Sequence, residues 1–306
     1  MSRDCFYRVR ASKELTIFSV LEILRVVEFK SLKLVTLLIV GVLVLVGLAG
    51  LLKALSHNKP NVLSPHTSVT QASPQILPNN KVKYPQDFTF VLVGDSMTAT
   101  LGNSDELRMY MKKYYYNKSF EFLNYGFGST NILSVEQRLT QKTQYYREYR
   151  PILDIDFDLI LIESFGNNPL SQYPLDEGLK IQTQTLDKIV SLIKNSNPRA
   201  VIVFVATIAP NSKKYGEGQV ELSPEKRAEW AAERTAYIKN HIAYAQSHNI
   251  PLVNVYQKSL LNGDGNLEYL DKTNYIHRSP SGVYFISHEI ADFIYQNKIL
   301  DLVKKD

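Results

Sequence analysis

Short apolar runs alternate with longer amphipathic stretches from about residue 87 to the end of the chain. The apolar runs predict five strands, over residues 88–93, 120–123, 157–162, 200–207 and 251–255. Three of these runs are almost entirely apolar, which is typical of parallel strands that are covered on both faces. The stretches between them predict helices, among them 175–194 and 224–247, with Ser223 as the N-cap of the second. This alternation predicts a three-layer α/β/α sandwich around a mostly parallel five-stranded sheet.

The first 86 residues follow a different pattern. Residues 34–52 carry no charge and only one polar side chain, Thr36, and this length is enough to cross a bilayer as a helix. We therefore expect one transmembrane helix over residues 34–55. A cleaved signal peptide is the alternative, because small residues follow the run at Ala54-Leu55-Ser56.

The charges on either side of this run predict its orientation. Residues 1–33 hold seven Lys and Arg against four acids, so this basic segment is expected in the cytoplasm. Residues 56–86 are rich in Pro, Ser and Asn and are expected to form a linker. The domain of residues 87–306 then lies outside the cytoplasm.

Composition limits the classes of partner and cofactor. The net charge of +5 owes much to the N-terminal segment, so it gives no indication of nucleic-acid binding. The single cysteine, Cys5, excludes an internal disulfide and a thiolate metal cage. The histidines lack the spacing of a metal site, and His241 is assigned to a polar-faced helix. We expect no metal and no cofactor.

The most informative motif is Gly94-Asp95-Ser96, directly after the first predicted strand. It places Ser96 between the end of a strand and the start of a helix, where backbone N–H groups favour a developing anion. A serine is a weak nucleophile without a base, so this role requires a histidine and oxyanion donors elsewhere. The alternative is that Asp95 or Ser96 only caps the helix.

Two further segments follow strand ends and offer hydrogen-bond donors. Gly126 can bring its backbone N–H close to a ligand, and Asn168 can donate from its side-chain amide. The alternatives are an ordinary glycine-rich turn and an Asx turn before Pro169. Ligands of parallel α/β sheets bind beyond the carboxyl ends of the strands, so we expect Ser96, Gly126 and Asn168 at one edge.

A histidine follows near the C-terminus, where His277 lies in a loop before the last helix. The order of these motifs resembles the SGNH (GDSL-type) hydrolase family over about residues 87–299. The resemblance implies a flavodoxin-like fold, with Ser96 as the nucleophile and His277 as the general base. It also implies an oxyanion hole formed by the Ser96 N–H, the Gly126 N–H and the Asn168 side chain.

One position departs from the family pattern. The family usually has an aspartate three residues before the histidine, and here that position is Asn274. An amide oxygen can hold the imidazole tautomer, but it stabilises the imidazolium less than a carboxylate does. Asp271, three residues further upstream, or a backbone carbonyl are the alternatives for the third member of the triad.

These motifs predict a membrane-tethered, extracytoplasmic serine esterase. It would hydrolyse acyl esters of carbohydrate or lipid through an acyl-enzyme, and its location makes envelope carbohydrate an attractive substrate. The first alternative is an O-acyltransferase that uses the same Ser/His site to modify an envelope glycan. The second is a non-catalytic glycan-binding or scaffold domain.

Two other features of the sequence could contribute to substrate specificity. The tyrosines at 114–116 and at 145–146 are interpreted as packing against the sides of helices, and stacking on sugars is the alternative. The loop of residues 209–222 follows the fourth strand, and it either shapes specificity through Lys213, Lys214 or Tyr215 or is solvated.

Overall fold

A computed structural model describes residues 81–304 of the chain. The predicted cytoplasmic segment, the transmembrane helix over residues 34–55 and all but the last residues of the linker lie outside this range. Within residues 81–304, the structure contains no helix that is both long and apolar enough to cross a membrane.

A five-stranded sheet forms the centre of the domain. Its strands lie in the order β2-β1-β5-β6-β7, and every pair is parallel. This is the 2-1-3-4-5 order of flavodoxin-like folds, which confirms the predicted sheet. The strands are β1 (Phe88–Gly94), β2 (Phe120–Gly126), β5 (Leu159–Glu163), β6 (Val201–Ala206) and β7 (Leu252–Asn254).

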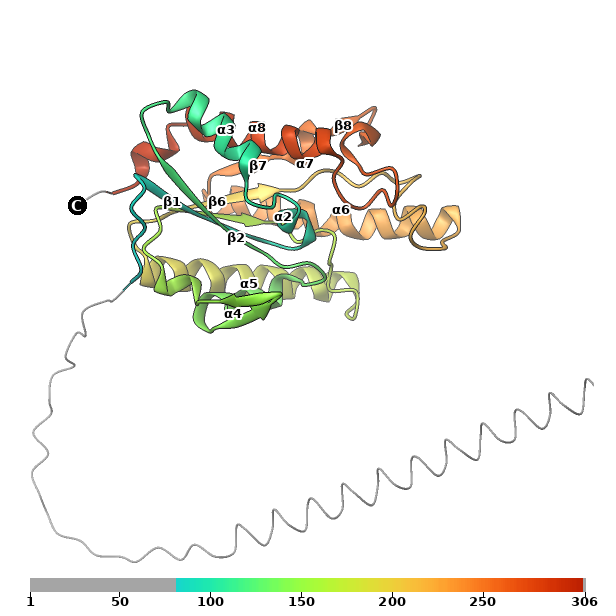
Figure 1. Ribbon diagram of the computed structural model, residues 1–306. Helices are drawn as coiled ribbons and strands as arrows, with labels where there is room; N and C mark the ends of the chain where they lie inside the picture. Colours follow the sequence, from blue (N-terminus) through green and yellow to red (C-terminus); the bar gives the residue numbers. More distant parts are fainter. Residues whose placement is uncertain (1–80, 305–306) are drawn as a thin grey trace, which may run out of the picture. The chain divides into compact units, whose positions relative to one another are not determined.

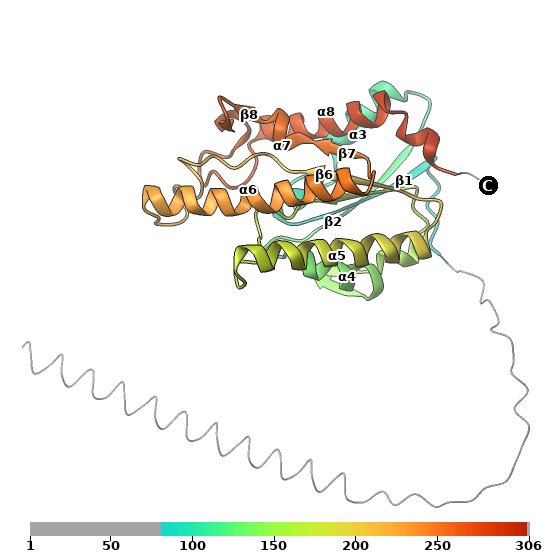
Figure 2. The same ribbon diagram turned by 180° about the vertical axis from the view of Figure 1, so that it is seen from behind.

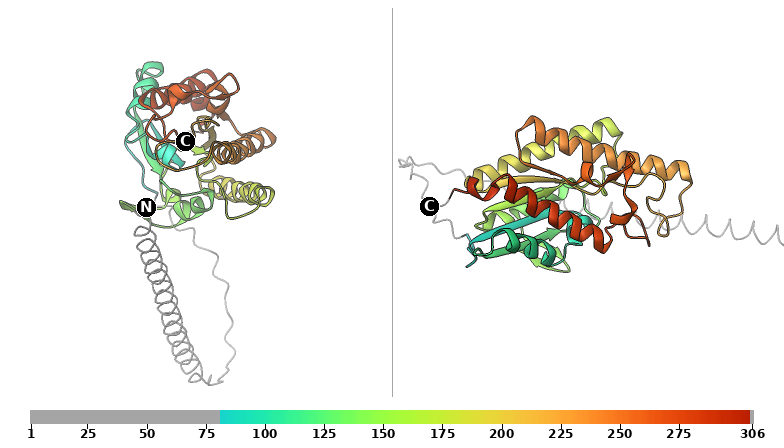
Figure 3. Two further views of the ribbon diagram at one scale, coloured as in Figure 1. Left: turned by 90° about the vertical axis from the view of Figure 1, so that its right-hand side faces the viewer. Right: turned by 90° about the horizontal axis from the view of Figure 1, so that it is seen from above.

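Helices cover both faces of the sheet, as Figures 1 and 2 show. One face carries α3 (Asp105–Tyr114) and α8 (Pro280–Gln296). The other carries α4 (Val135–Thr140), α5 (Leu175–Ser196) and α6 (Pro224–Ser247). The shorter elements are α2 (Ser96–Ala99), α7 (Val255–Lys258) and two hairpins, β3 (Thr143–Tyr145) with β4 (Arg147–Tyr149) and β8 (Leu260–Leu261) with β9 (Asp264–Gly265). The left-hand view in Figure 3, turned by 90° from Figure 1, shows the same layers end-on.

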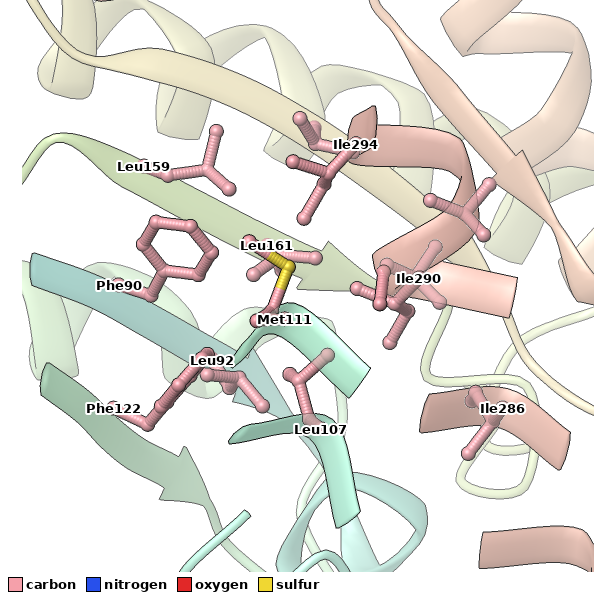
Figure 4. Packing of buried hydrophobic residues seen from close by; sticks show 14 of the residues in the cluster. Phe90, Leu92, Leu107, Met111, Phe122, Leu159, Leu161, Ile286, Ile290 and Ile294 are labelled. Carbon is pink, nitrogen blue, oxygen red and sulfur yellow. The ribbon is translucent and has the colours of Figure 1, made fainter. Parts of the chain in front are cut away.

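The apolar strands explain this layering, because their side chains point alternately to the two faces. Phe90 and Leu92 of β1 pack with α3 and α8, whereas Val91 and Val93 pack with the helices of the opposite face. All seven residues of β1 are buried. Figure 4 shows the first of these clusters, in which Leu107, Met111, Ile286, Ile290 and Ile294 meet the strands.

Helix α6 follows its predicted bounds but not its predicted polarity. The Ser223 side chain caps it by accepting from the Lys226 N–H, as expected. His241, however, is completely buried and stacks on Phe204 with 4.3 Å between the ring centroids. Burial lowers the pKa of His241 to about 3, so this imidazole is neutral at ordinary pH. The expected polar face at this position is therefore wrong, because α6 packs against both the sheet and α5.

Candidate active site

The sequence motifs converge where the chain reverses its path through the sheet. From β1 the chain passes to β2 on one side and then returns to β5 on the other. Ligands of such sheets bind beyond the carboxyl ends of the strands at this switch point. Ser96 follows β1, and Asn167 and Asn168 follow β5.

Ser96 is the first residue of α2. The turn that leads into this helix starts at Gly94, where a larger residue would not fit. A Cβ atom added to Gly94 would lie 2.0 Å from Thr98 Oγ1. Asp95 is the N-cap, and its Oδ1 accepts from the Met97 N–H at 2.8 Å. The Ser96 N–H belongs to the first turn, where backbone N–H groups have no intrahelical acceptor. Asp95 therefore caps α2, as one of the alternatives predicted. This cap also fixes the start of the helix, where Ser96 lies.

Two glycines lie at the end of β2, Gly126 as its last residue and Gly128 just beyond it, and they differ in their surroundings. The Gly126 N–H donates to Asn124 Oδ1 at 2.8 Å, and a Cβ on Gly126 would lie 2.2 Å from the Ala99 nitrogen. Gly126 therefore lets β2 pack closely against α2. A Cβ on Gly128 would instead lie 3.6 Å from Ser96 Cβ, and the Gly128 N–H donates to the Tyr145 hydroxyl at 2.7 Å. Gly128 therefore lies against Ser96, and its N–H and that of Gly126 each have a side-chain acceptor.

The two asparagines after β5 also have distinct partners. Asn168 Nδ2 donates to Asp95 Oδ2 at 2.9 Å, which ties this loop to the Ser96 turn. Asn167 Oδ1 accepts from the Tyr215 hydroxyl at 3.0 Å, which leaves the Nδ2 end of the amide for a ligand. The loop begins at Phe165, whose φ of +55° is strained for a bulky side chain.

Tyr215 connects the asparagine loop to α6. Its side chain is 2% exposed, and its hydroxyl accepts from Arg234 Nε at 2.9 Å while it donates to Asn167. The same loop reaches the histidine segment, because a Cβ on Gly218 would lie 2.5 Å from the Thr273 carbonyl oxygen. Sequence reasoning identified Tyr215 only as a loop residue near the site. It gave no signal for Arg234, which lies on α6 some 70 residues from Asn167.

The histidine loop is held by its own side chains. Asn274 Oδ1 accepts from the backbone N–H groups of Ile276 at 2.9 Å and His277 at 2.8 Å. The Asn274 amide oxygen therefore supports the backbone of the loop. Asp271 Oδ1 accepts from the N–H and hydroxyl of Thr273, which lowers the Asp271 pKa, and the nearby His277 lowers it further. The two residues are also joined through the backbone, because the Asp271 N–H donates to the His277 carbonyl oxygen at 2.8 Å.

Four buried charges lie beneath these loops. Burial raises the pKa of Asp95, and burial together with the Asp95 charge raises that of Glu163 well above its usual value. Burial lowers the pKa of Arg138 and of Arg278 to about 10 each, and the two carboxyls oppose that effect. Arg278 directly follows His277, so this cluster brings the histidine loop to the Ser96 turn.

Arg138 of α4 binds the strand ends directly. Its Nη1 donates to the carbonyl oxygens of Gly94 at 2.7 Å and Tyr125 at 2.8 Å. Its guanidinium also lies over the Phe127 ring, 4.4 Å from the centroid. Arg138 therefore joins the ends of β1 and β2, the two strands that lead to Ser96 and Gly128.

Comparisons with known proteins yield structural likeness only. No protein-family model and no curated protein matches the chain. It is similar to the lipase/acylhydrolase from Enterococcus faecalis, at 15% identity and a TM-score of 0.49, over 69% of this chain and 96% of that one. A GDSL-like lipase from Bacteroides thetaiotaomicron is 12% identical with a TM-score of 0.46, over 68% of this chain and 88% of that one. An acetyl xylan esterase is 13% identical with a TM-score of 0.46, over 68% and 98%.

The Arg138 contacts generate a prediction about stability. Arg138→Met should lower the free energy of unfolding by about 3–5 kcal/mol, because it leaves buried carboxyls with less compensation and frees two strand-end carbonyls. Urea denaturation measures this change. Arg147→Met is the control, since Arg147 is exposed and should cost no more than about 1 kcal/mol. Equal costs for the two variants would contradict the structural role of Arg138.

Proposed function

We propose that this chain is a serine esterase that hydrolyses acyl esters of carbohydrate or lipid through an acyl-enzyme. The proposal includes a membrane tether with the catalytic domain outside the cytoplasm, which rests on the apolar run at residues 34–52. The observation that carries the enzymatic part is the convergence at one sheet edge. Ser96 begins a helix there, and the asparagine loop is hydrogen-bonded to Asp95, the residue that precedes it. Arg278, which follows His277, is buried, and the Glu163 and Asp95 carboxyls act on its charge.

In this mechanism Ser96 Oγ attacks the ester carbonyl while His277 accepts its proton. The carbonyl oxygen becomes an oxyanion, which the Ser96 N–H, the Gly128 N–H and an asparagine amide stabilise. Gly128 now donates to the Tyr145 hydroxyl, so the substrate oxygen would displace that hydroxyl. His277 then protonates the leaving alcohol, and water activated by the same histidine releases the acid.

We assign the amide donor to Asn167 and an anchoring role to Asn168. Asn168 already commits one amide hydrogen to the buried Asp95 carboxyl. Asn167 is held only through its oxygen, so both amide hydrogens are free to meet an oxyanion. For the group that supports His277, we choose Asp271 over Asn274, because the amide oxygen of Asn274 is used on the loop backbone.

The first test uses a fluorophosphonate probe, which labels activated serines. Wild-type protein should be labelled, and Ser96→Ala should not. Ser129→Ala is the control, because Ser129 is an exposed serine three residues after Gly126, and it should be labelled like the wild type. Folded wild-type protein that resists labelling would favour the scaffold alternative. Product analysis with water against sugar acceptors distinguishes an esterase from an acyltransferase.

The second test separates the two asparagines. Asn167→Ala should lower kcat by about 10²–10³-fold with little change in KM, because it removes a contact to the developing charge. Tyr215→Phe should lower kcat by a smaller factor in the wild type and should be silent in the Asn167→Ala background. Asn168→Ala should instead lower stability by about 1–3 kcal/mol, since it leaves a buried carboxyl with one partner fewer. A large loss of kcat in Asn168→Ala alone would reverse the assignment.

The third test concerns the group that supports the imidazole. Asp271→Asn should lower kcat by about 10²–10⁴-fold, because the imidazolium loses its carboxylate. Asn274→Asp should give no gain, since the loop backbone already occupies that side chain. Glu268→Gln removes the same charge from the same segment and serves as the control. If Asp271→Asn has the same kcat and KM as Glu268→Gln, Asp271 does not support the imidazole. The proposed catalytic groups are then a dyad of Ser96 and His277.

A further inference from the structure

The tip of the β3–β4 hairpin carries an exposed tyrosine, Tyr146, in a backbone conformation that does not favour a large side chain. Tyr145 pairs with Arg147, so the single residue Tyr146 connects the two strands. Its φ is +57°, a left-handed conformation that glycine or asparagine adopts at lower cost. Its side chain is 94% exposed, and its ring meets the Tyr145 ring edge-on, with the centroids 4.5 Å apart. The chain therefore keeps a large aromatic ring in a strained position with almost no burial in return.

This tip borders a groove of about 830 Å³, within the size range of ligand sites. The floor of the groove is β2, which is an edge strand of the sheet. One wall comes from the segment around α2 and α3, and the other comes from the hairpin, which lies beside α4 in Figure 1. The groove is therefore open to solvent along the length of β2.

One end of the groove lies next to the proposed active site. Ala99, Gly126 and Tyr145 all line it. The Tyr145 hydroxyl accepts from the Gly128 N–H at 2.7 Å, and Gly128 is adjacent to Ser96. The Tyr145 ring also stacks on Phe127 at 4.6 Å, which holds the base of the hairpin in place. A ligand along β2 would consequently extend toward the serine.

The lining indicates which class of ligand fits. Aromatic rings alternate with charged groups of both signs, such as Arg108 and Glu121, and Arg147 lies 4.7 Å over the Tyr149 ring. Donors and acceptors of this kind match hydroxyl groups, and the negative face of an exposed ring attracts the polarised C–H groups of a sugar. A continuous apolar lining, which a long acyl chain requires, is not what these residues provide.

A peptide strand added to β2 fits less well. The Phe120 carbonyl already accepts from Arg108, and the Gly126 N–H already donates to Asn124 Oδ1. The Asn124 amide also donates to the carbonyl oxygens of Thr98 and Gly102. Side chains thus occupy both ends of the free edge, which is how natural edge strands resist pairing.

We propose that the groove between β2 and the β3–β4 hairpin binds an oligosaccharide chain, with Tyr146 stacked on one of its sugar rings. The inference rests on the proposed function, because it makes this chain the carrier of the ester that Ser96 attacks. Tyr146 is then a specificity residue that acts on the carbohydrate and not on the reacting carbonyl.

The experiment compares two substrates in the full chain: p-nitrophenyl acetate, which is too small to fill the groove, and O-acetylated xylohexaose. Tyr146→Gly removes the ring and suits the left-handed backbone, so a folding defect is not expected. It should lower kcat/KM about tenfold on the hexasaccharide, through KM, and leave p-nitrophenyl acetate unchanged. Tyr146→Phe should retain the wild-type values. Tyr116→Ala is the matched control, because Tyr116 is 80% exposed and lies outside the groove.

The outcomes separate this inference from the proposed function. Equal hexasaccharide kinetics for Tyr146→Gly and Tyr116→Ala would overturn the groove proposal while the esterase stands. A loss seen equally on both substrates would also overturn it, since the ring would then act on the catalytic groups. If the wild type hydrolyses neither substrate, the groove proposal is tested by binding alone. Calorimetry then measures the binding of xylohexaose and chitohexaose to Ser96→Ala. Binding of either sugar that Tyr146→Gly weakens about tenfold supports the groove, whereas binding of neither sugar, or binding that the variant leaves unchanged, overturns it.

Discussion

Charge compensation in a buried cluster is the constraint on which the site depends. Asp95 and Glu163 lie at the carboxyl ends of adjacent strands, and each is less than 5% exposed. Two carboxyls cannot both ionise at low cost in such a place without cations nearby. Arg138 from α4 and Arg278 from the histidine loop supply those cations. The position of the Ser96 turn is therefore coupled to elements far away in the chain.

This coupling gives the cluster a structural role in assembling the proposed catalytic groups. Asp95 caps α2 and holds Asn168, so the nucleophile turn and the asparagine loop share one carboxyl. Arg278 follows His277 directly and is 5% exposed, and the Glu163 and Asp95 carboxyls oppose the effect of burial on its pKa. None of these charges needs to touch a substrate. Their effect is to hold the serine, the asparagines and the histidine at one edge of the sheet.

Around this fixed centre, two peripheral elements have different tasks. Tyr215 and Arg234 form a relay from α6 to Asn167, in which each hydrogen bond fixes the orientation of the next group. The β3–β4 hairpin contributes Tyr145 at its base and an exposed Tyr146 at its tip. The relay is buried and rigid, whereas the hairpin tip is solvated. This division is what we expect if the first serves the reaction and the second serves recognition of a larger ligand.

The sequence by itself determined the parallel sheet, the long helices and the edge at which the motifs gather. Apolar runs such as that of β1 can be buried only between two helical layers, and a cap such as Ser223 acts within a few residues of its helix, so local pattern is enough. The predicted membrane segment is equally local, but it lies outside the described residues. Only the tertiary structure distinguishes the surroundings of Gly126 from those of Gly128, and those of Asn167 from those of Asn168. Members of each pair are chemically alike, and they differ through partners such as Tyr145, Asp95 and Tyr215 that the chain brings from a distance. The buried state of His241 and Arg278 has the same origin, because burial depends on what packs over a residue and not on its neighbours in sequence.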